Sequence, residues 1–500
     1  MVSAFYHDVN GGYVFLRRIL LILLVLLLLC GCGTSASSPG TTVPAQTDSA
    51  STTHTETAPE TTDRAGSGLS ELTADTVLFY RQADFKDRRG TLIPLETVRS
   101  ASEEELLPRT HLYDERFPGD GALLLRLLDY AFAQGYQGFS VLPGTVPVPD
   151  AKQYRALAFA YWIDGGSILS SEQDGCLTFW HSCEREDEME KFSLGLAAAR
   201  ELSAQIPRGD DWETASWIFS WLAENVGYGD RTPYYFQRGH MLYDALVEKD
   251  CLCSGYANAM YYLCNLCGVE CLNVYGLATD PATPGGLGDH LWNYVRIYGT
   301  WYVCDPTANT TMHLGVNVAF ALSFDTMQAI GGNKPTGEYT DSTMLPACEA
   351  AFDPVSVWNT TPEGALRSWL WFGTYDAFDP AYLLMQAGLM TEETEVTPSA
   401  DGMEAEMDIP YADYAAWADR FMSPEAQDLF PVRFFEAEDG RLIARKSETD
   451  NRNDWMNAEL RSVSAGEDGS YTADLGTMTV RFTVSQTEEG LYRIETVSLS

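Results

Sequence analysis

The stretch between residues 253 and 304 constrains the fold more than any other part of this 500-residue chain. Residues 253–267 form an apolar run that Gly268 ends, which is the pattern of a helix closed by glycine at its C′ position. Strands are predicted at 271–275, 291–297 and 301–304, and a Tyr-Gly-Thr turn joins the last two into a hairpin. A helix followed by these strands predicts an α+β core.

Cysteine, histidine and aspartate residues stand at the ends of these elements. Cys253 opens the helix, where the helix dipole favours a thiolate and backbone amides without intrahelical partners can meet an oxyanion. His290 precedes one hairpin strand and Asp305, fixed by Pro306, follows the other, so the two side chains should meet. We therefore predict Cys253 as nucleophile, His290 as base and Asp305 as the orienter of the imidazole.

Three linked motifs resemble the Cys, His and Asp signatures of the transglutaminase-like superfamily. They are Cys253-x-Gly255-Tyr256-Ala257, His290-Leu291-Trp292-Asn293 and Trp301-Tyr302-x-x-Asp305-Pro306-Thr307, with Gly276 closing the strand between the first two. The resemblance covers about 100 residues and implies a papain-like fold, in which the Cys helix packs on an antiparallel sheet that carries His and Asp. It also implies thiol chemistry through an acyl-enzyme, with cross-linking, deamidation or amide hydrolysis as outcomes.

The chain departs from this family pattern at two positions. Many bacterial members have Gly-Val before the nucleophile, where this chain has Cys251-Leu252, and Leu291 stands where a small residue is common. Neither change removes a triad group. They bear on substrate fit and on redox behaviour, since Cys251 and Cys253 are close enough to interact under oxidation.

Candidates for the rest of the cleft are fewer. The backbone amide of Cys253 is the first choice as oxyanion donor, with Tyr228 or Tyr256 as possible assistants. Packing in the core is the alternative for Tyr256. Trp292 is a hairpin aromatic, expected in the core, with a cleft wall as its alternative place.

Two other function classes compete with a thiol enzyme. The first is a surface binding or scaffolding protein that kept the fold and lost the reaction. The second is a four-thiolate zinc site from Cys251-x-Cys253 and Cys264-x-x-Cys267, which the helix makes unfavourable by holding the pairs roughly 16 Å apart. We expect no metal and no cofactor.

The other cysteines are expected to have structural places. Cys264, Cys267 and Cys271 suit core packing. Cys176 and Cys183 flank Trp180 and His181, and a disulfide or simple loop residues are favoured there over a metal site. Nine cysteines follow Cys32, so at least one of them stays unpaired within the chain.

The N-terminus indicates export. Arg17-Arg18 and the apolar run 19–29 are typical of a signal peptide, because the run is too short to cross a bilayer. Leu29-Cys30-Gly31-Cys32 resembles a bacterial lipobox, with Cys32 as the lipidated residue. Residues 33–70, rich in Ser, Thr and Pro, should form a flexible tether. We expect an extracytoplasmic protein with a lipid anchor in the cell membrane.

The net charge of the chain limits which classes of partner it can bind. The chain has 32 Lys and Arg against 71 Asp and Glu, a net charge of −39, which argues against nucleic acid. A protein or cell-wall peptide is the expected substrate, and a monomer the expected state.

The predicted organisation is signal peptide and lipobox 1–32, tether 33–70, an α+β module 71–208, the catalytic domain 209–345, a helical connector and acidic linker 346–407, and a second α+β module 408–500.

Within the C-terminal module the sequence predicts helices followed by one curved antiparallel sheet. Strands are expected from alternation at 432–437, 441–445, 478–484 and 491–497. Residues 392–407 are acidic and polar, and are expected to be a linker. Asp211 is predicted to cap the helix that contains Trp217 and Trp221.

Overall fold

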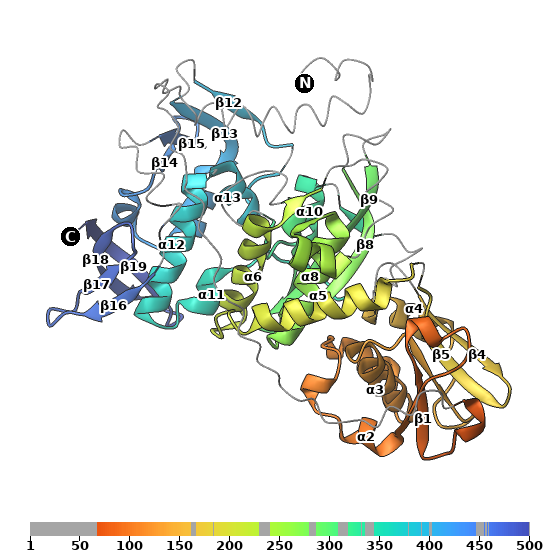
Figure 1. The fold of residues 1–500 in the computed structure, drawn as a ribbon. Coiled ribbons are helices and arrows are strands. Elements are labelled where there is room, and N and C mark those ends of the chain that lie inside the picture. Colours follow the sequence, from red (N-terminus) through yellow and green to blue (C-terminus); the bar gives the residue numbers. More distant parts are fainter. Residues whose placement is uncertain are drawn as a thin grey trace, which may run out of the picture.

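A computed structural model shows the arrangement of the chain (Figure 1). It describes residues 68–161, 167–183, 185–229, 241–279, 287–308, 319–331, 333–335, 345–378, 380–391, 393–399, 403–446, 455, 458 and 460–499. The predicted signal peptide, Cys32 and the tether up to residue 67 lie outside these residues. Within the described ranges, no helix has both the length and the apolar character needed to span a membrane.

The N-terminal part is built on a five-stranded antiparallel sheet with strand order β2-β1-β3-β5-β4. Phe79, Phe139 and Phe179 lie opposite one another on three neighbouring strands, with ring centroids 5.8 and 5.5 Å apart, and so form one aromatic row in the core. The elements are β1 (Thr76–Tyr80), β2 (Thr91–Pro94), α2 (Leu95–Ser100), α3 (Asp120–Ala133), β3 (Gly138–Val141), α4 (Ala151–Ala160), β4 (Ile168–Gln173) and β5 (Cys176–His181), with short 3₁₀ turns between them.

The central part places helices against a four-stranded antiparallel sheet of order β10-β9-β8-β11. Its hairpin closes through Tyr298 and Gly299, whose φ angles of 49° and 82° suit the tight turn predicted there. The elements are α5 (Glu188–Ser203), α6 (Asp211–Asn225), β6 (Gly227–Tyr228), α7 (Met241–Tyr243), a π-helical turn η5 (Asp244–Glu248), β7 (Asp250–Cys251), α8 (Cys253–Leu266), β8 (Cys271–Thr279), β9 (Leu287–Ile297), β10 (Thr300–Cys304), α10 (Phe324–Gly331) and β11 (Lys334–Pro335).

The cap of α6 differs from the prediction by one residue. Asp210, not Asp211, occupies the N-cap position, and its carboxylate accepts a hydrogen bond from the Glu213 amide at 2.9 Å. The Asp211 carboxylate instead accepts from the Tyr298 amide at 2.9 Å. Asp210 therefore caps the start of α6, while Asp211 fixes the hairpin turn that joins β9 to β10.

The C-terminal part holds helices and two sheets. The single curved sheet predicted here was wrong, because two four-stranded antiparallel sheets are present, of order β12-β13-β15-β14 and β16-β17-β18-β19. The elements are α11 (Pro354–Trp358), α12 (Pro362–Phe378), α13 (Pro380–Gln386), β12 (Val396–Pro398), β13 (Glu404–Pro410), α14 (Tyr411–Ala418), β14 (Val432–Glu436), β15 (Arg441–Lys446), β16 (Ser462–Ala465), β17 (Tyr471–Asp474), β18 (Thr479–Gln486) and β19 (Tyr492–Leu499).

The linker predicted at 392–407 was also wrong in part. Val396–Pro398 and Glu404–Pro410 are strands of the first C-terminal sheet. Met407 and Ile409 are buried while Asp408 between them is exposed, so the segment has the alternation of a half-buried strand. Its acidic residues lie on the solvent face, which is why composition alone suggested a linker.

The three parts share one buried apolar cluster that runs from Val77 to Ile494. The Tyr261 hydroxyl donates to the Ala160 carbonyl at 3.1 Å, linking α8 to the N-terminal part. Arg367 on α12 forms an ion pair with Asp210 at 2.8 Å, linking the C-terminal helices to α6. The central helices are therefore bonded to the N-terminal part on one side and to the C-terminal helices on the other.

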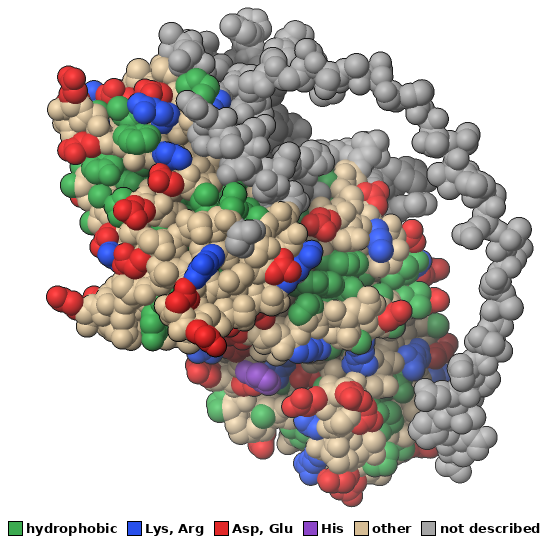
Figure 2. Space-filling model, turned by 90° about the vertical axis from the view of Figure 1, so that its left-hand side faces the viewer, with side chains coloured by type: hydrophobic (Ala, Val, Ile, Leu, Met, Phe, Trp, Pro, Cys, Tyr) green, Lys and Arg blue, Asp and Glu red, His purple; other side chains and the backbone are tan. Residues whose placement is uncertain are grey.

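On the face shown in Figure 2, acidic side chains are spread out rather than gathered in one place. Figure 2 shows Asp and Glu scattered across the visible face, with Lys and Arg among them. Many of these charges are paired, for example Arg445 with Glu404 at 2.5 Å and Arg296 with Glu270 at 2.6 Å. Exposed pairs of this kind add little stability and mainly keep the surface soluble.

Candidate active site

Cys253 is the first residue of α8. The residue before it, Leu252, occupies the N-cap position without a side-chain cap, although its carbonyl accepts from the Gly255 amide at 2.9 Å. No side chain therefore competes as an N-cap for the amides of the first turn, where the positive end of the helix dipole favours a thiolate. The Cys253 residue is half-buried. Its backbone amide stays the first candidate for an oxyanion donor.

His290 and Asp305 meet across the β9–β10 hairpin. The His290 Nε2 atom lies 2.6 Å from Asp305 Oδ2. The Asp305 side chain is 1% exposed and that of His290 is 14% exposed. Because Nε2 is engaged with the carboxylate, Nδ1 is the ring nitrogen left to exchange a proton with a thiol.

The Asp305 carboxylate is held by the chain on several sides. The Asp305 amide donates to the Ala319 carbonyl at 2.8 Å, and the Ala308 amide donates to Asp305 Oδ1 at 3.2 Å. Asn333, which is buried just before β11, donates from Nδ2 to Asp305 Oδ2 at 3.4 Å. These contacts fix the carboxylate at the end of β10 in one orientation toward His290.

Electrostatics couples the thiol to the imidazole. Burial raises the pKa of Cys253, but hydrogen bonds from His290 and the Leu291 amide and the His290 charge lower this pKa below its ordinary value. Burial likewise lowers the pKa of His290, but the Asp305 carboxylate and the Cys253 thiol raise it well above its ordinary value. The two shifts in opposite directions favour a thiolate beside an imidazolium.

Trp292 supports the imidazole from beneath. Its indole is fully buried and stacks on the His290 ring at a centroid distance of 5.9 Å and an angle of 24°. Gly276 lies opposite His290 in the β8–β9 register, and a Cβ there would lie 2.7 Å from the Trp292 ring and 2.2 Å from the Lys334 carbonyl oxygen. The absent side chain makes room for the indole, so Trp292 is a buried platform rather than a cleft wall.

The two tyrosines proposed as oxyanion assistants have different places. Tyr256 is fully buried and its hydroxyl donates to the Val226 carbonyl, which is the core packing named as its alternative place. Tyr228 is half-buried, pairs with Cys251 in the β6–β7 register and stacks on Tyr256 at 6.3 Å. Tyr228 therefore stays the one tyrosine of the two with a partly exposed side chain beside the nucleophile loop.

Three buried asparagines, one on the Cys helix and two on the sheet beneath it, connect α8 to that sheet, and the sequence patterns did not indicate them. Asn293 on β9 donates to the Ala257 carbonyl of α8 at 3.0 Å and to Asn273 Oδ1 at 3.0 Å. Asn273 in turn donates to Asn258 Oδ1 at 3.2 Å. This polar ladder fixes α8 against the sheet that carries His290. The one sequence feature that could have indicated this ladder is the presence of asparagine side chains within otherwise apolar helices and strands.

The remaining thiols differ from Cys253. Cys176 and Cys183 are not bonded to each other, so the disulfide suggested as one alternative does not form. Burial raises the pKa of Cys267, at the C-terminal end of α8, to about 11, and raises those of Cys251, Cys264 and Cys304 well above the ordinary value. The pKa of Cys253 is shifted in the opposite direction to those of these four thiols.

A thiol at a helix N-terminus, beside an imidazole held by a carboxylate on an antiparallel sheet, defines a fold of the thiol-enzyme type. Comparison with known families agrees with this class: residues 200–306 match the family model described as "Transglutaminase-like superfamily". The chain thus carries a transglutaminase-like domain in its central part, and the predicted α+β core of papain-like type is confirmed.

Several known proteins are similar to part of the chain. Human kyphoscoliosis peptidase is 29% identical over 104 residues, which are 19% of this chain and 16% of that protein. Mouse kyphoscoliosis peptidase is 28% identical over the same shares. A solved structure described as "Crystal structure of a TGase" is 11% identical with a TM-score of 0.20, covering 34% of this chain and 50% of that one. The chain therefore spans a small part of the curated relatives.

Proposed function

We propose that this protein is a thiol enzyme of transglutaminase-like type that acts on amide bonds of proteins or peptides. In this proposal Cys253 is the nucleophile, His290 the base and Asp305 its orienter. The observation that carries it is the 2.6 Å contact between His290 Nε2 and Asp305 Oδ2, which leaves the other ring nitrogen for Cys253.

The first half of the reaction forms a thioester. The Cys253 thiolate attacks the carbonyl carbon of a carboxamide, and the oxygen that becomes negative is met by the Cys253 amide. The C–N bond then breaks as the His290 imidazolium gives its proton to the departing nitrogen. Asp305 keeps the ring oriented and stabilises its charge. Acyl-enzyme and ammonia, or a free amine, are the products of this step.

The second half returns the thiol. Neutral His290 takes a proton from water or from a primary amine, whose oxygen or nitrogen attacks the thioester carbon. The C–S bond breaks and the Cys253 sulfur leaves as thiolate, stabilised again by the imidazolium. Water gives hydrolysis or deamidation, and an amine gives a cross-link.

Differential alkylation tests the proposed nucleophile. Iodoacetamide at neutral pH should label Cys253 fastest, with the site of labelling read by peptide mass spectrometry. Cys267 is the matched control, because it is also half-buried, lies at the other end of the same helix and has a pKa raised to about 11. Equal rates at Cys253 and Cys267 would contradict the proposal.

His290→Ala provides the second arm of this test. Without the imidazolium the Cys253 thiol should titrate at or above the ordinary range, so its labelling should slow at least ~10-fold at neutral pH. Labelling of Cys267 should not change. A glutamine-containing peptide incubated with hydroxylamine should also yield a hydroxamate with the parent chain and none with Cys253→Ser, because hydroxylamine captures the acyl-enzyme.

We also propose that the enzyme works outside the cytoplasm, attached to the cell membrane by a lipid on Cys32. The support is the basic and apolar N-terminus followed by Leu29-Cys30-Gly31-Cys32 and a polar tether. Cells fed a radiolabelled fatty acid should incorporate it into the parent chain. Cys32→Ala should abolish incorporation while Cys30→Ala should not, and label retained in Cys32→Ala would refute the assignment.

A further inference from the structure

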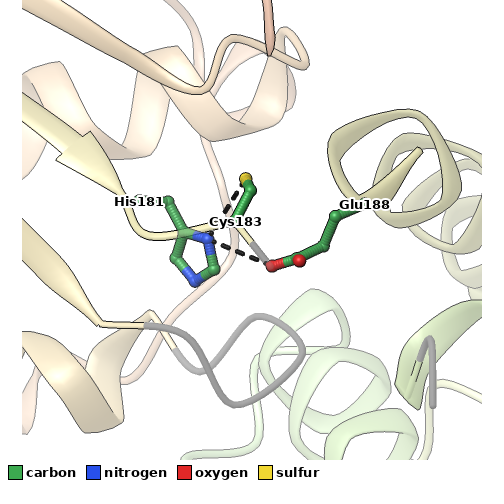
Figure 3. Close-up of side chains that lie close together, drawn as sticks. All are labelled: His181, Cys183 and Glu188. Atoms are coloured by element: carbon green, nitrogen blue, oxygen red, sulfur yellow. Dashed lines mark hydrogen bonds and ion pairs between the residues drawn. The ribbon is translucent and has the colours of Figure 1, made fainter. Parts of the chain in front are cut away.

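A second group of cysteine, histidine and carboxylate lies where the N-terminal sheet meets α5. His181 is the last residue of β5, Cys183 follows two positions later, and Glu188 is the first residue of α5. Their side chains converge (Figure 3): the Cys183 sulfur lies 3.6 Å from His181 Nδ1, and Glu188 Oε1 lies 3.3 Å from the same nitrogen. His181 and Glu188 are 0% and 1% exposed, and Cys183 is half-buried.

This group does not have the geometry of a second catalytic triad. A relay needs the thiol and the carboxylate on opposite ring nitrogens, as at His290, so that one nitrogen moves the proton while the other is held. At His181 both partners approach Nδ1. An ion pair between His181 and Glu188 would account for one contact, but it would not account for the thiol on the same nitrogen.

The separations suit three ligands around one ion. Zinc binds His nitrogen, carboxylate oxygen and Cys sulfur at about 2.0–2.3 Å in a tetrahedron, which puts neighbouring ligand atoms roughly 3.3–3.6 Å apart. The measured Nδ1–Oε1 and Nδ1–Sγ distances are 3.3 and 3.6 Å, and all three ligand atoms lie within 4.8 Å of one another. Nitrogen, oxygen and sulfur together are a donor set typical of a borderline-soft divalent cation.

The surroundings orient two of these ligands. The His181 backbone is fixed in both directions by Gln137, whose carbonyl accepts from the His181 amide at 2.9 Å and whose Nε2 donates to the His181 carbonyl at 2.9 Å. The Arg185 amide donates to Glu188 Oε2 at 3.2 Å, which leaves Oε1 directed at the imidazole. Outer contacts of this kind hold ligands in place before the ion binds.

We propose that His181, Cys183 and Glu188 bind a Zn²⁺ ion, with water as the fourth ligand. From the sequence alone, a disulfide or simple loop residues were favoured over a metal site at Cys183. A thiolate and a carboxylate balance the charge of the ion, so binding releases the Cys183 proton.

The ion would act as a structural clamp between the N-terminal sheet and the catalytic part. It would join the end of β5 to the start of α5, and α5 runs along the central helices (Figure 1). Phe192 on α5 packs edge-on against Tyr262 of α8 with centroids 5.7 Å apart. The clamp therefore lies one helix away from the helix that begins at Cys253, and its role does not depend on the proposed reaction.

Cobalt substitution of the purified full-length chain tests the site. The reduced protein is stripped with a chelator, dialysed, and titrated with Co²⁺ and then Zn²⁺. We expect a thiolate-to-cobalt charge-transfer band and the strong visible bands of tetrahedral Co²⁺, saturating at one ion per chain and displaced by Zn²⁺. Cys183→Ser should lose the charge-transfer band, and its zinc affinity in a competition with a coloured chelator should fall at least ~10–100-fold.

Two controls separate this site from other thiols. Cys267→Ser removes another half-buried thiol, and Cys253→Ser removes the one beside His290, and both should keep the band and the stoichiometry. No charge-transfer band in the parent chain, or a band that persists in Cys183→Ser, would overturn the proposal. Glu188→Gln tests the third ligand, and if that variant fails to fold, the parent and Cys183→Ser spectra still decide.

Discussion

Two clusters in this molecule use the same three residue types and differ in how they engage the imidazole. At His290 the carboxylate takes Nε2 and leaves Nδ1 to the thiol, whereas at His181 the thiol and the carboxylate both approach Nδ1. The first arrangement can pass a proton between partners. The second brings three donors to one point, as chelation requires. Connectivity around the ring, rather than residue type, separates the proposed relay from the proposed metal site.

The largest expected effect comes from removing the nucleophile. Cys253→Ser should lower amide turnover by about 10⁴-fold or more, because the hydroxyl is a far weaker nucleophile and no thioester can form. Turnover is measured as ammonia release or amine incorporation. Cys267→Ser, at the opposite end of the same helix, should keep the parental rate. Comparable losses in both variants would point to damage of α8 rather than to nucleophilic catalysis.

Replacing the orienting carboxylate tests the relay itself. Asp305→Asn keeps the shape but removes the charge that raises the pKa of His290, so kcat should fall about 10²–10⁴-fold. Asp289→Asn is the matched control, since Asp289 is an exposed carboxylate next to His290 on β9. The zinc content of Asp305→Asn should equal that of the parent chain. A fall in zinc content in this variant would mean that the two clusters are not separate sites.

The pH dependence of alkylation and that of turnover should differ, because turnover needs the His290 imidazolium as acid and alkylation does not. The Cys253 thiolate should persist below the pH at which ordinary thiols ionise and be lost as the pH falls through its lowered pKa. Turnover, which also needs the imidazolium as acid, should fall again as the pH rises through the raised pKa of His290, while alkylation stays fast. Rates of both processes across a pH series measure this. Identical upper limbs for alkylation and turnover would refute the imidazolium's role as acid.

Local patterns were enough to predict where the three proposed triad residues lie. Cys253 begins α8, Asp305 directly follows β10, and His290 lies within β9, which starts at Leu287 rather than at the predicted residue 291. Asn333 could not be found this way, because it precedes β11, a two-residue strand that pairs with β8 at the far edge of the sheet. Its approach to Asp305 depends on sheet order, which no local pattern encodes.

The cluster of His181, Cys183 and Glu188 could not be predicted from local patterns either. His181 and Cys183 are visible as neighbours in the sequence, but Glu188 joins them only because α5 begins against the end of β5. The pattern therefore favoured a disulfide or simple loop residues. In the C-terminal part the acidic character of β13 outweighed the alternation of Met407 and Ile409, so a strand was taken for a linker.

A glycine substitution should perturb the platform under His290 without touching a reacting group. Gly276→Ala places a methyl group 2.7 Å from Trp292 and 2.2 Å from a backbone oxygen of Lys334, so the free energy of unfolding should fall by about 1–3 kcal/mol. Denaturant unfolding measures this. Gly227→Ala, where the nearest atom is an Asp250 carboxylate oxygen at 3.3 Å, is the control with a smaller cost. Equal losses in the free energy of unfolding of the two variants would mean that the Trp292 side chain shifts readily to make room for the methyl group.

The smallest expected effect concerns Asn333, which acts through Asp305. Its 3.4 Å hydrogen bond is long, so Asn333→Ala should cost about 0.5–1.5 kcal/mol of transition-state stabilisation, a few-fold in kcat, with KM unchanged. A positioning role predicts that the pH at which turnover declines also shifts, since the carboxylate that Asn333 orients sets the pKa of His290. Asn333→Gln, which keeps an amide, should recover part of the shift. A lower melting temperature with an unmoved pH profile would leave Asn333 a packing residue.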